Sequence, residues 1–193
     1  DGSAKEDIRM LTALDIWEEL REIGGNRFNH VTISGGNPAL IAAIDDLLTV
    51  FKENGIKSAL ETQGSRWQDW FLDIDELTLS PKPPSSGMKT DFEKLDFILE
   101  QLKEHKSYSL KVVIFNDEDL EYATDLHERY PDVPFFLQVG NTNLSSENEK
   151  GLLNQLITDY EKLIDTVTES DRLNNVRVLP QLHTYVWGNK RGV

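Results

Sequence analysis

Hydrophobic positions along the chain switch between two spacings, one typical of strands and one typical of helices. Short apolar or β-branched runs predict six strands, at 30–34, 57–62, 76–80, 109–115, 134–139 and 176–179. Apolar residues at helical spacing predict helices at 12–23, 38–54, 92–102, 118–130 and 145–167. Strands that alternate with helices in this way form a parallel α/β sheet or barrel. The length of 193 residues suits one domain, so we expect residues 1–193 to fold as a single α/β domain.

Polar residues mark the beginnings of several predicted helices. Thr12 and Asp15 form a capping-box pattern, and Pro38 suits the first turn of a helix that we expect to continue to 54. Asn116 precedes the acidic run 117–119. We interpret this run as a helix cap followed by acidic side chains that complement the helix dipole.

Nearly every predicted strand ends in polar residues. The six ends are Ser34-Gly35-Gly36-Asn37, Glu61-Thr62-Gln63-Gly64, Ser80-Pro81-Lys82, Phe115-Asn116-Asp117, Gln138-Val139-Gly140-Asn141 and Pro180-Gln181-Leu182-His183. Parallel α/β folds bind ligands at the carboxyl ends of their strands, in barrels and open sheets alike. The convergence of polar residues at these ends therefore predicts a ligand site on one rim of the sheet.

Several of these positions carry candidate chemistry, and each also has a plainer structural interpretation. Gly35 and Gly36 either expose backbone amides to a phosphate, carboxylate or amine, or form only a tight turn. Glu61 either faces the interior of the sheet or is a surface carboxylate. Lys82, next to two prolines, either binds a carboxylate ligand or is solvated. A lone histidine such as His183 is more often structural than catalytic.

Composition and charge narrow the classes of function. The 34 acidic residues outnumber the 20 Lys and Arg, and the resulting net charge of −14 repels the phosphates of nucleic acids. No apolar run is long enough to span a bilayer, so we expect a cytoplasmic protein with neither a nucleic acid nor a membrane as its partner. The chain has no cysteine, which excludes thiolate-held zinc or iron–sulfur sites, and its histidines lack metal-ligand spacing. We therefore expect a small-molecule ligand or a protein partner, and no metal site in this chain.

The strand 30–33 and the following Ser34-Gly35-Gly36-Asn37-Pro38 resemble the glycine motif of radical S-adenosylmethionine enzymes. Together with the other strand ends, the chain is similar to the 7-carboxy-7-deazaguanine synthase family of queuosine biosynthesis, a tRNA-modification pathway, in the form found in Bacillus-like bacteria. The likeness covers essentially all 193 residues. It implies a partial parallel (βα) barrel of the radical S-adenosylmethionine type.

The resemblance also implies the chemistry of the intact enzyme, which is a carbon–nitrogen lyase. A [4Fe-4S] cluster on cysteines reduces S-adenosylmethionine to methionine and a 5′-deoxyadenosyl radical. The radical abstracts hydrogen from 6-carboxy-5,6,7,8-tetrahydropterin. Ring contraction with loss of ammonia then gives 7-carboxy-7-deazaguanine, assisted by Mg²⁺.

Carried over by motif, the resemblance assigns site residues in this chain. The residues that would hold S-adenosylmethionine are Gly36, Ser80, Lys82, Gln138, Val139, Gly140 and Asn141. Ser34 and Val193 would face the pterin. Glu61 and His183 are the candidates for a catalytic role.

Two features depart from the family pattern. Asn37 stands where the glycine motif usually carries an acid, and the cysteine loop that holds the cluster is absent. Because that loop belongs to the first βα unit, we expect a segment of roughly 40 to 50 residues to be missing before Asp1. The chain then carries most of the pocket without the radical initiator. We expect it to bind no cluster, to be inactive alone, and to form a homo-oligomer through the strand edge left open at 30–34.

Two other functions are compatible with the residues alone. A noncatalytic α/β module would bind a small ligand or a protein partner through the loop at Gly35 and Gly36. A metal-independent barrel enzyme would use Glu61 and Lys82 as acid and base, which requires the two side chains to lie within hydrogen-bond reach.

Overall fold

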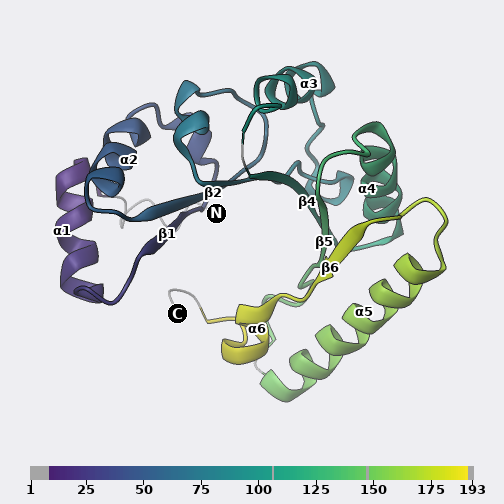
Figure 1. Cartoon of the computed structure of the whole chain (residues 1–193). Coiled ribbons are helices and arrows are strands. Elements are labelled where there is room, and N and C mark those ends of the chain that lie inside the picture. Colours follow the sequence, from purple (N-terminus) through teal and green to yellow (C-terminus); the bar gives the residue numbers. More distant parts are fainter. Residues whose placement is uncertain (1–8, 106, 147, 191–193) are drawn as a thin grey trace.

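The computed structural model describes residues 9–105, 107–146 and 148–190. Its six strands form one parallel sheet in the order of the sequence: β1 (His30–Ile33), β2 (Lys57–Thr62), β3 (Glu76–Leu79), β4 (Tyr108–Ile114), β5 (Phe135–Val139) and β6 (Val176–Leu179). This order never reverses, whereas a doubly wound sheet requires a reversal. The sheet curls into an open arc (Figure 1). The predicted α/β class and partial parallel barrel are therefore confirmed.

Helices cover the convex side of the arc, while the last short helix lies near its open side (Figure 1). The helices are α1 (Ala13–Gly24), α2 (Ile44–Glu53), α3 (Phe92–Gln101), α4 (Asp117–Arg129), α5 (Glu149–Glu169) and α6 (Leu182–Trp187). Three single turns, η2 (Pro38–Leu40), η3 (Asp69–Asp73) and η4 (Pro84–Ser86), lie in the connections. Right-handed crossovers place successive helices on one face of a parallel sheet. Within the described residues, none of these helices has the length and apolar character needed to cross a membrane.

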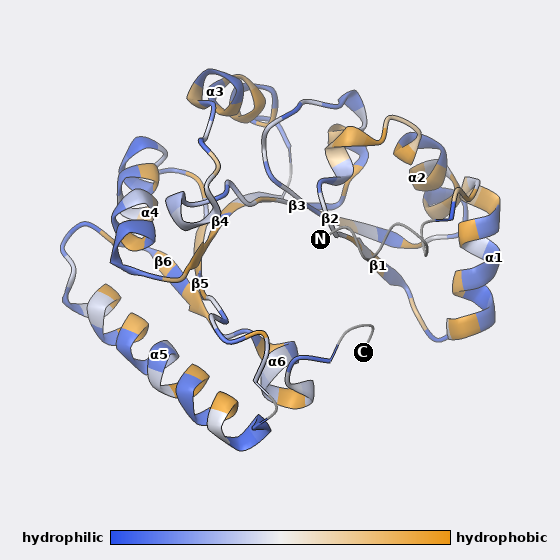
Figure 2. Cartoon of the chain, turned by 180° about the vertical axis from the view of Figure 1, so that it is seen from behind, coloured by the Kyte–Doolittle hydropathy of each residue, from blue (hydrophilic) through white to orange (hydrophobic). Residues whose placement is uncertain are grey.

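The hydrophobic core lies between the convex face of the sheet and the helices, and Figure 2 shows apolar helix faces turned toward the strands. Every second strand residue contributes to it, including Leu60, Leu77, Leu79, Leu110, Val112, Phe135 and Leu137. The residues between them, such as Glu61, Thr78 and Lys111, lie on the concave face and are only partly buried. The concave face thus carries charged and hydroxyl side chains beside apolar ones such as Val113 and Phe136, which leaves the inside of the arc suited to a ligand with polar groups.

The structure differs from the sequence prediction in two helices. The single helix expected over 38–54 is divided into η2 and α2, because Ile41 has an extended backbone and both Leu40 and Ile41 are exposed. The prediction counted these two apolar residues as part of one buried stripe. The helix α6 was not predicted, since its six residues are too few to display a helical period.

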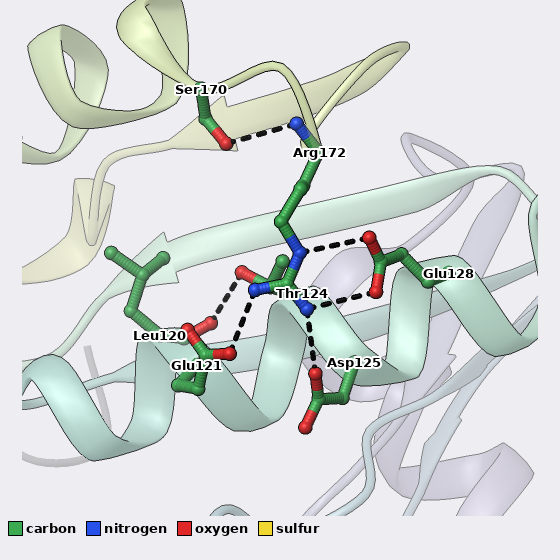
Figure 3. Close-up of polar contacts among 7 residues, drawn as sticks. All are labelled: Leu120, Glu121, Thr124, Asp125, Glu128, Ser170 and Arg172. Atoms are coloured by element: carbon green, nitrogen blue, oxygen red, sulfur yellow. Dashed lines mark hydrogen bonds and ion pairs between the residues drawn. The ribbon is translucent and has the colours of Figure 1, made fainter.

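Arg172 joins the loop before β6 to the middle of α4 (Figure 3). Its guanidinium forms ion pairs of 2.7 to 2.8 Å with Glu121, Asp125 and Glu128, which share one face of the helix. Hydrogen bonds from Arg172 hold the pKa of Glu128 below its usual value. Without the guanidinium these carboxylates would repel one another.

We expect Arg172→Met to lower the midpoint of thermal unfolding modestly at neutral pH, and by less in 1 M salt, because exposed ion pairs are screened. The pKa of Glu128 is lower in the folded state than its ordinary value of 4.5. The ion pair therefore stabilises the fold above pH 4.5, and this stabilisation is lost as the pH falls through the pKa of the folded state. Circular dichroism melts of Arg172→Met and the unaltered chain, recorded between about pH 7 and pH 2, should show the difference between their midpoints shrink as the pH falls. A difference that stays constant over that range would contradict the role of the ion pairs.

Candidate functional site

The carboxyl ends of β1, β2 and β3 surround a cavity of about 290 Å³, here called the glycine cavity. Its lining residues are Ser34, Gly35, Gly36, Glu61, Thr62, Gln63, Ser80 and Lys82. Three strand ends that are far apart in the sequence therefore meet in one polar depression. The structure brings together five of the residues assigned by the family resemblance, namely Ser34, Gly36, Glu61, Ser80 and Lys82.

The two glycines of this cavity have backbones that side chains rarely adopt. Gly35 has φ of 92° and Gly36 has φ of 56°, both in the left-handed region. A Cβ atom added to either residue would meet no other atom within 4 Å. Conformation rather than crowding thus requires glycine here, and the space beside the main chain stays open to a ligand.

Asn37 connects the turn after β1 to the end of β2. The hydroxyl of Thr62 donates to Asn37 Oδ1 at 2.6 Å, and Asn37 Nδ2 donates to Ser65 Oγ at 3.0 Å. Asn37 is not among the residues that line the glycine cavity. The side chain at the position of the usual acid therefore acts as a neutral clamp on the glycine turn.

We expect Asn37→Leu to lower the free energy of unfolding by about 1 to 2 kcal/mol, since it removes one partly buried and one exposed hydrogen bond. Asn37→Asp should stay within about 0.5 kcal/mol of the unaltered chain, because the hydroxyls of Thr62 and Ser65 can both donate to a carboxylate. Urea denaturation of the three proteins measures the difference. Equal losses in both variants would contradict the clamp.

The loop that carries Lys82 is held from outside the cavity by Asp119. This carboxylate is fully buried and accepts hydrogen bonds from the main-chain amide of Ser85 at 3.0 Å, from its hydroxyl at 2.7 Å, and from the amide of Phe115 at 3.0 Å. Asp119 lies in the first turn of α4, as the helix-dipole interpretation of the acidic run 117–119 requires, but that interpretation does not account for these hydrogen bonds. Its side chain turns inward because η4 packs against the first turn of α4 and presents these donors.

A second cavity of about 200 Å³ lies at the ends of β5 and β6 beside α6 and is here called the tail cavity. Its lining residues are Asn141, Leu144, Gln181, His183, Thr184, Gly188, Asn189 and Lys190. Asn141 Nδ2 donates to Asn189 Oδ1 at 2.8 Å, and Asn189 Nδ2 donates to the carbonyl of Asn143 at 3.0 Å. These bonds fix the segment after α6 against the strand ends.

The turn 138–141 does not line the glycine cavity, and its side chains are engaged within the protein. Gln138 Nε2 donates to a main-chain carbonyl of the next strand end at 3.2 Å, Val139 lies in the core and Asn141 is buried. A Cβ atom on Gly140 would lie 2.4 Å from the ring of Phe115. What this turn offers to a ligand is its main chain.

The candidates for catalysis lie in different cavities. His183 lines the tail cavity, where its Nε2 shares a hydrogen bond of 3.2 Å with the hydroxyl of Thr184. Glu61 and Lys82 both line the glycine cavity. Within the described part of the chain no hydrogen bond or ion pair joins them, because Glu61 is bonded to Lys111 instead. The pairing required of a Glu61–Lys82 acid and base is thus not found, and Val193 lies outside the described residues.

Sequence reasoning missed three residues that shape the site. These are Lys111, which pairs with Glu61, Asp119, which holds the loop of Lys82, and Asn189, which fixes the tail. Only Lys111 carried a usable signal, a charged residue in the middle of the strand-like run 109–115.

No protein-family model matches the chain. The 7-carboxy-7-deazaguanine synthase of Bacillus cereus is 59% identical over 193 residues, which cover all of this chain and 81% of that protein. The chain belongs to the 7-carboxy-7-deazaguanine synthase family. The 7-carboxy-7-deazaguanine synthase of Bacillus subtilis strain 168 is 58% identical over 196 residues with the same coverage. The family resemblance inferred from the strand ends is confirmed.

Solved structures similar to this member of the 7-carboxy-7-deazaguanine synthase family agree on its fold. QueE from Escherichia coli has a TM-score of 0.55 and 18% identity, and the match covers 89% of this chain and 64% of that chain. SuiB from Streptococcus suis bound to S-adenosylmethionine has a TM-score of 0.61 and 19% identity, with coverage of 92% and 44%. At these identities the likeness concerns the fold alone, and it supports the radical S-adenosylmethionine type of partial barrel. This chain spans less than two thirds of either solved chain.

Proposed function

We propose that this chain forms the S-adenosylmethionine and pterin walls of a 7-carboxy-7-deazaguanine synthase, the carbon–nitrogen lyase that converts 6-carboxy-5,6,7,8-tetrahydropterin to 7-carboxy-7-deazaguanine. The observation that carries this proposal is the glycine cavity, in which Gly36, Ser80 and Lys82 meet at neighbouring strand ends. The identity of 59% to a synthase of this name supports the assignment of substrate.

The glycine cavity suits the methionyl end of S-adenosylmethionine, which carries an amino group and a carboxylate. The open main chain at Gly35 and Gly36 would hold the amino group, and the ammonium of Lys82 would balance the carboxylate. Ser80 and the main chain of the turn 138–141 would complete the cofactor wall. In the intact enzyme, S-adenosylmethionine reduced by the cluster would supply the radical that abstracts hydrogen from the substrate.

The pterin would lie between the two cavities on the concave side of the sheet. Ser34 lines the glycine cavity, whereas His183 and Lys190 line the tail cavity. A carboxylated pterin has a negative charge, which suits Lys190. Its ring also has hydrogen-bond donors and acceptors, which suit the polar side chains of Ser34 and His183. The assignment of Val193 to the pterin is part of the proposal as well.

The residues of this chain do not fit the two metal groups that the family implies. The sequence contains no cysteine to offer a thiolate to a [4Fe-4S] cluster. In the described ranges no group of three or more His, Cys, Asp or Glu side chains could hold Mg²⁺. The proposed role of the chain is therefore to bind and orient S-adenosylmethionine and the pterin.

Calorimetric titration tests the proposal. We expect the chain to bind S-adenosylmethionine and not to bind inorganic phosphate. Gly36→Val should weaken binding about tenfold, since valine is strained at a left-handed backbone by about 1 to 2 kcal/mol, and relief of that strain moves the main chain that would hold the ligand. Gly55→Val is the matched control, because Gly55 has φ of 68° and open space beside it but lies before β2, at the other end of the sheet. Binding of phosphate without S-adenosylmethionine would favour the noncatalytic module instead.

Reconstitution with iron and sulfide is expected to leave this chain without the visible charge-transfer absorption of an iron–sulfur cluster, and without turnover. The physical reason is the lack of thiolates, which the four histidines cannot replace because they are scattered along the sequence. Absorption spectra and iron analysis after desalting measure the result. A stable and stoichiometric cluster would refute this expectation.

The proposal also includes self-association. The two end strands of the sheet, β1 and β6, each have a second edge that no strand of the described residues pairs. Such edges favour pairing with another chain, so we propose a homo-oligomer. The net charge of −14 disfavours nucleic acid as a partner.

A further inference from the structure

The concave face of the sheet carries an ion pair that is more buried than the others. Lys111 Nζ lies 2.6 Å from Glu61 Oε2, and the two side chains are 14% and 37% exposed. The cations of the remaining ion pairs in the described residues are 42 to 65% exposed. A lysine this deeply enclosed needs a partner, because an unpaired charge in such surroundings is costly.

The pair spans one intervening strand. Glu61 of β2 is in register with Thr78 of β3, and Thr78 is in register with Ser109 of β4. Thr78 and Ser109 share a hydrogen bond of 3.3 Å. Lys111 lies two residues further along β4, so its side chain reaches diagonally across β3 to Glu61. The two positions in register with Glu61 on the neighbouring strands thus carry small hydroxyl side chains.

The contact leaves one oxygen of Glu61 available. Glu61 lines the glycine cavity, and the hydrogen bond from Lys111 is made to Oε2. In the described residues no hydrogen bond engages Oε1. The lysine thus restricts the orientation of the carboxylate, and Oε1 remains a possible acceptor on a residue that lines the cavity.

We propose that Lys111 is a positioning residue for the ligand site, holding Glu61 so that Oε1 accepts a hydrogen bond from an ammonium or hydroxyl group of the bound ligand. This inference rests on the proposed function, since it takes S-adenosylmethionine as the ligand. Lys111 acts through Glu61 and makes no contact with the ligand itself.

Calorimetry with S-adenosylmethionine on four variants tests the inference. Glu61→Gln and Lys111→Met should each weaken binding about tenfold, the effect of one charge-assisted hydrogen bond. The double variant should bind no more weakly than the weaker single variant, because both changes remove the same contact. Lys111→Arg should bind within about threefold of the unaltered chain, since a guanidinium can still donate to Glu61.

Arg177→Met is the matched control for charge. Arg177 is also a cation of the sheet, but it belongs to β6. Its guanidinium lies over the ring of Phe136 at 5.5 Å, and it does not line the glycine cavity. The control should bind S-adenosylmethionine within about twofold of the unaltered chain. An equal loss in Arg177→Met and Lys111→Met would show a general effect of charge and overturn the positioning role. Unchanged binding in Lys111→Met would overturn it as well.

Thermal unfolding of the same variants without ligand separates this inference from the proposed function. The two single variants should each lower the midpoint, and the double variant should lower it by less than the sum of the two. If the unaltered chain does not bind S-adenosylmethionine while this coupling is present, the proposed function fails and the pairing of Lys111 with Glu61 stands. Additive losses in the melts would overturn the pairing itself.

Discussion

Replacing Asp119 by alanine is expected to lower the free energy of unfolding by about 3 kcal/mol, because three donors lose a fully buried acceptor. The loss has a local consequence, since the amide and hydroxyl of Ser85 are what attach η4 to α4. Without these contacts to α4, the loop that carries Lys82 can adopt more conformations. Urea denaturation followed by circular dichroism measures the stability.

Two variants separate the hydrogen bonds of Asp119 from its charge. Asp117→Ala removes an acid from the same helical turn, but Asp117 is exposed, so the loss should be no more than about 0.5 kcal/mol. Ser85→Ala removes one of the three hydrogen bonds and should cost about 1 kcal/mol. Equal stability of Asp119→Ala and Asp117→Ala would show that Asp119 serves only the helix dipole.

Asp119→Ala should also weaken the binding of S-adenosylmethionine if Lys82 contributes to that binding as proposed. Calorimetry on Asp119→Ala at a temperature where it remains folded isolates this effect from unfolding. A variant that is less stable but binds normally would show that Lys82 keeps its position without the contact to α4.

The strands could be predicted because each one is a local pattern. The runs 57–62 and 176–179 agree at both ends with β2 and β6, and they are followed by Gln63-Gly64 and by Pro180-Gln181. Parallel pairing in sequence order then brings the strand ends to one rim, which is why Ser34, Glu61 and Ser80 could be grouped from the sequence. Local signals and a simple topology suffice for this part of the site.

The rest could not be predicted because it depends on partners distant in the sequence. Lys111 meets Glu61 across 50 residues, and Asp119 meets Ser85 across 34. A side chain in the middle of a strand shows only which face it occupies, and an acid in the first turn of a helix has a sufficient local explanation. Asn37 is similar, since its clamp requires the hydroxyl of Thr62, 25 residues away.

The chain is expected to associate with itself as its concentration rises, through the open edge of β1. No described strand pairs with the outer side of β1, so its main-chain groups there can pair with a second copy. The neighbouring helix α1 adds apolar surface, because Leu14 is 62% and Ile23 is 78% exposed. Exchange of the N-terminal segment, Asp1 to Leu11, is the other route to such a dimer, although most of that segment lies outside the described residues.

The net charge of −14 opposes this association, but only over a short range. The Debye length is about 8 Å at 0.15 M salt and about 3 Å at 1 M, whereas docked strands gain hydrogen bonds at contact. Sedimentation velocity from micromolar to hundreds of micromolar should therefore show a mass that rises with concentration, and more steeply at high salt. Thr32→Lys, which places a charge on the edge strand, should keep the chain monomeric over a wider range. Thr168→Lys on α5 adds the same charge away from the edge and should not. An ideal monomer over the whole range, or equal behaviour of the two lysine variants, would show that β1 does not form the contact.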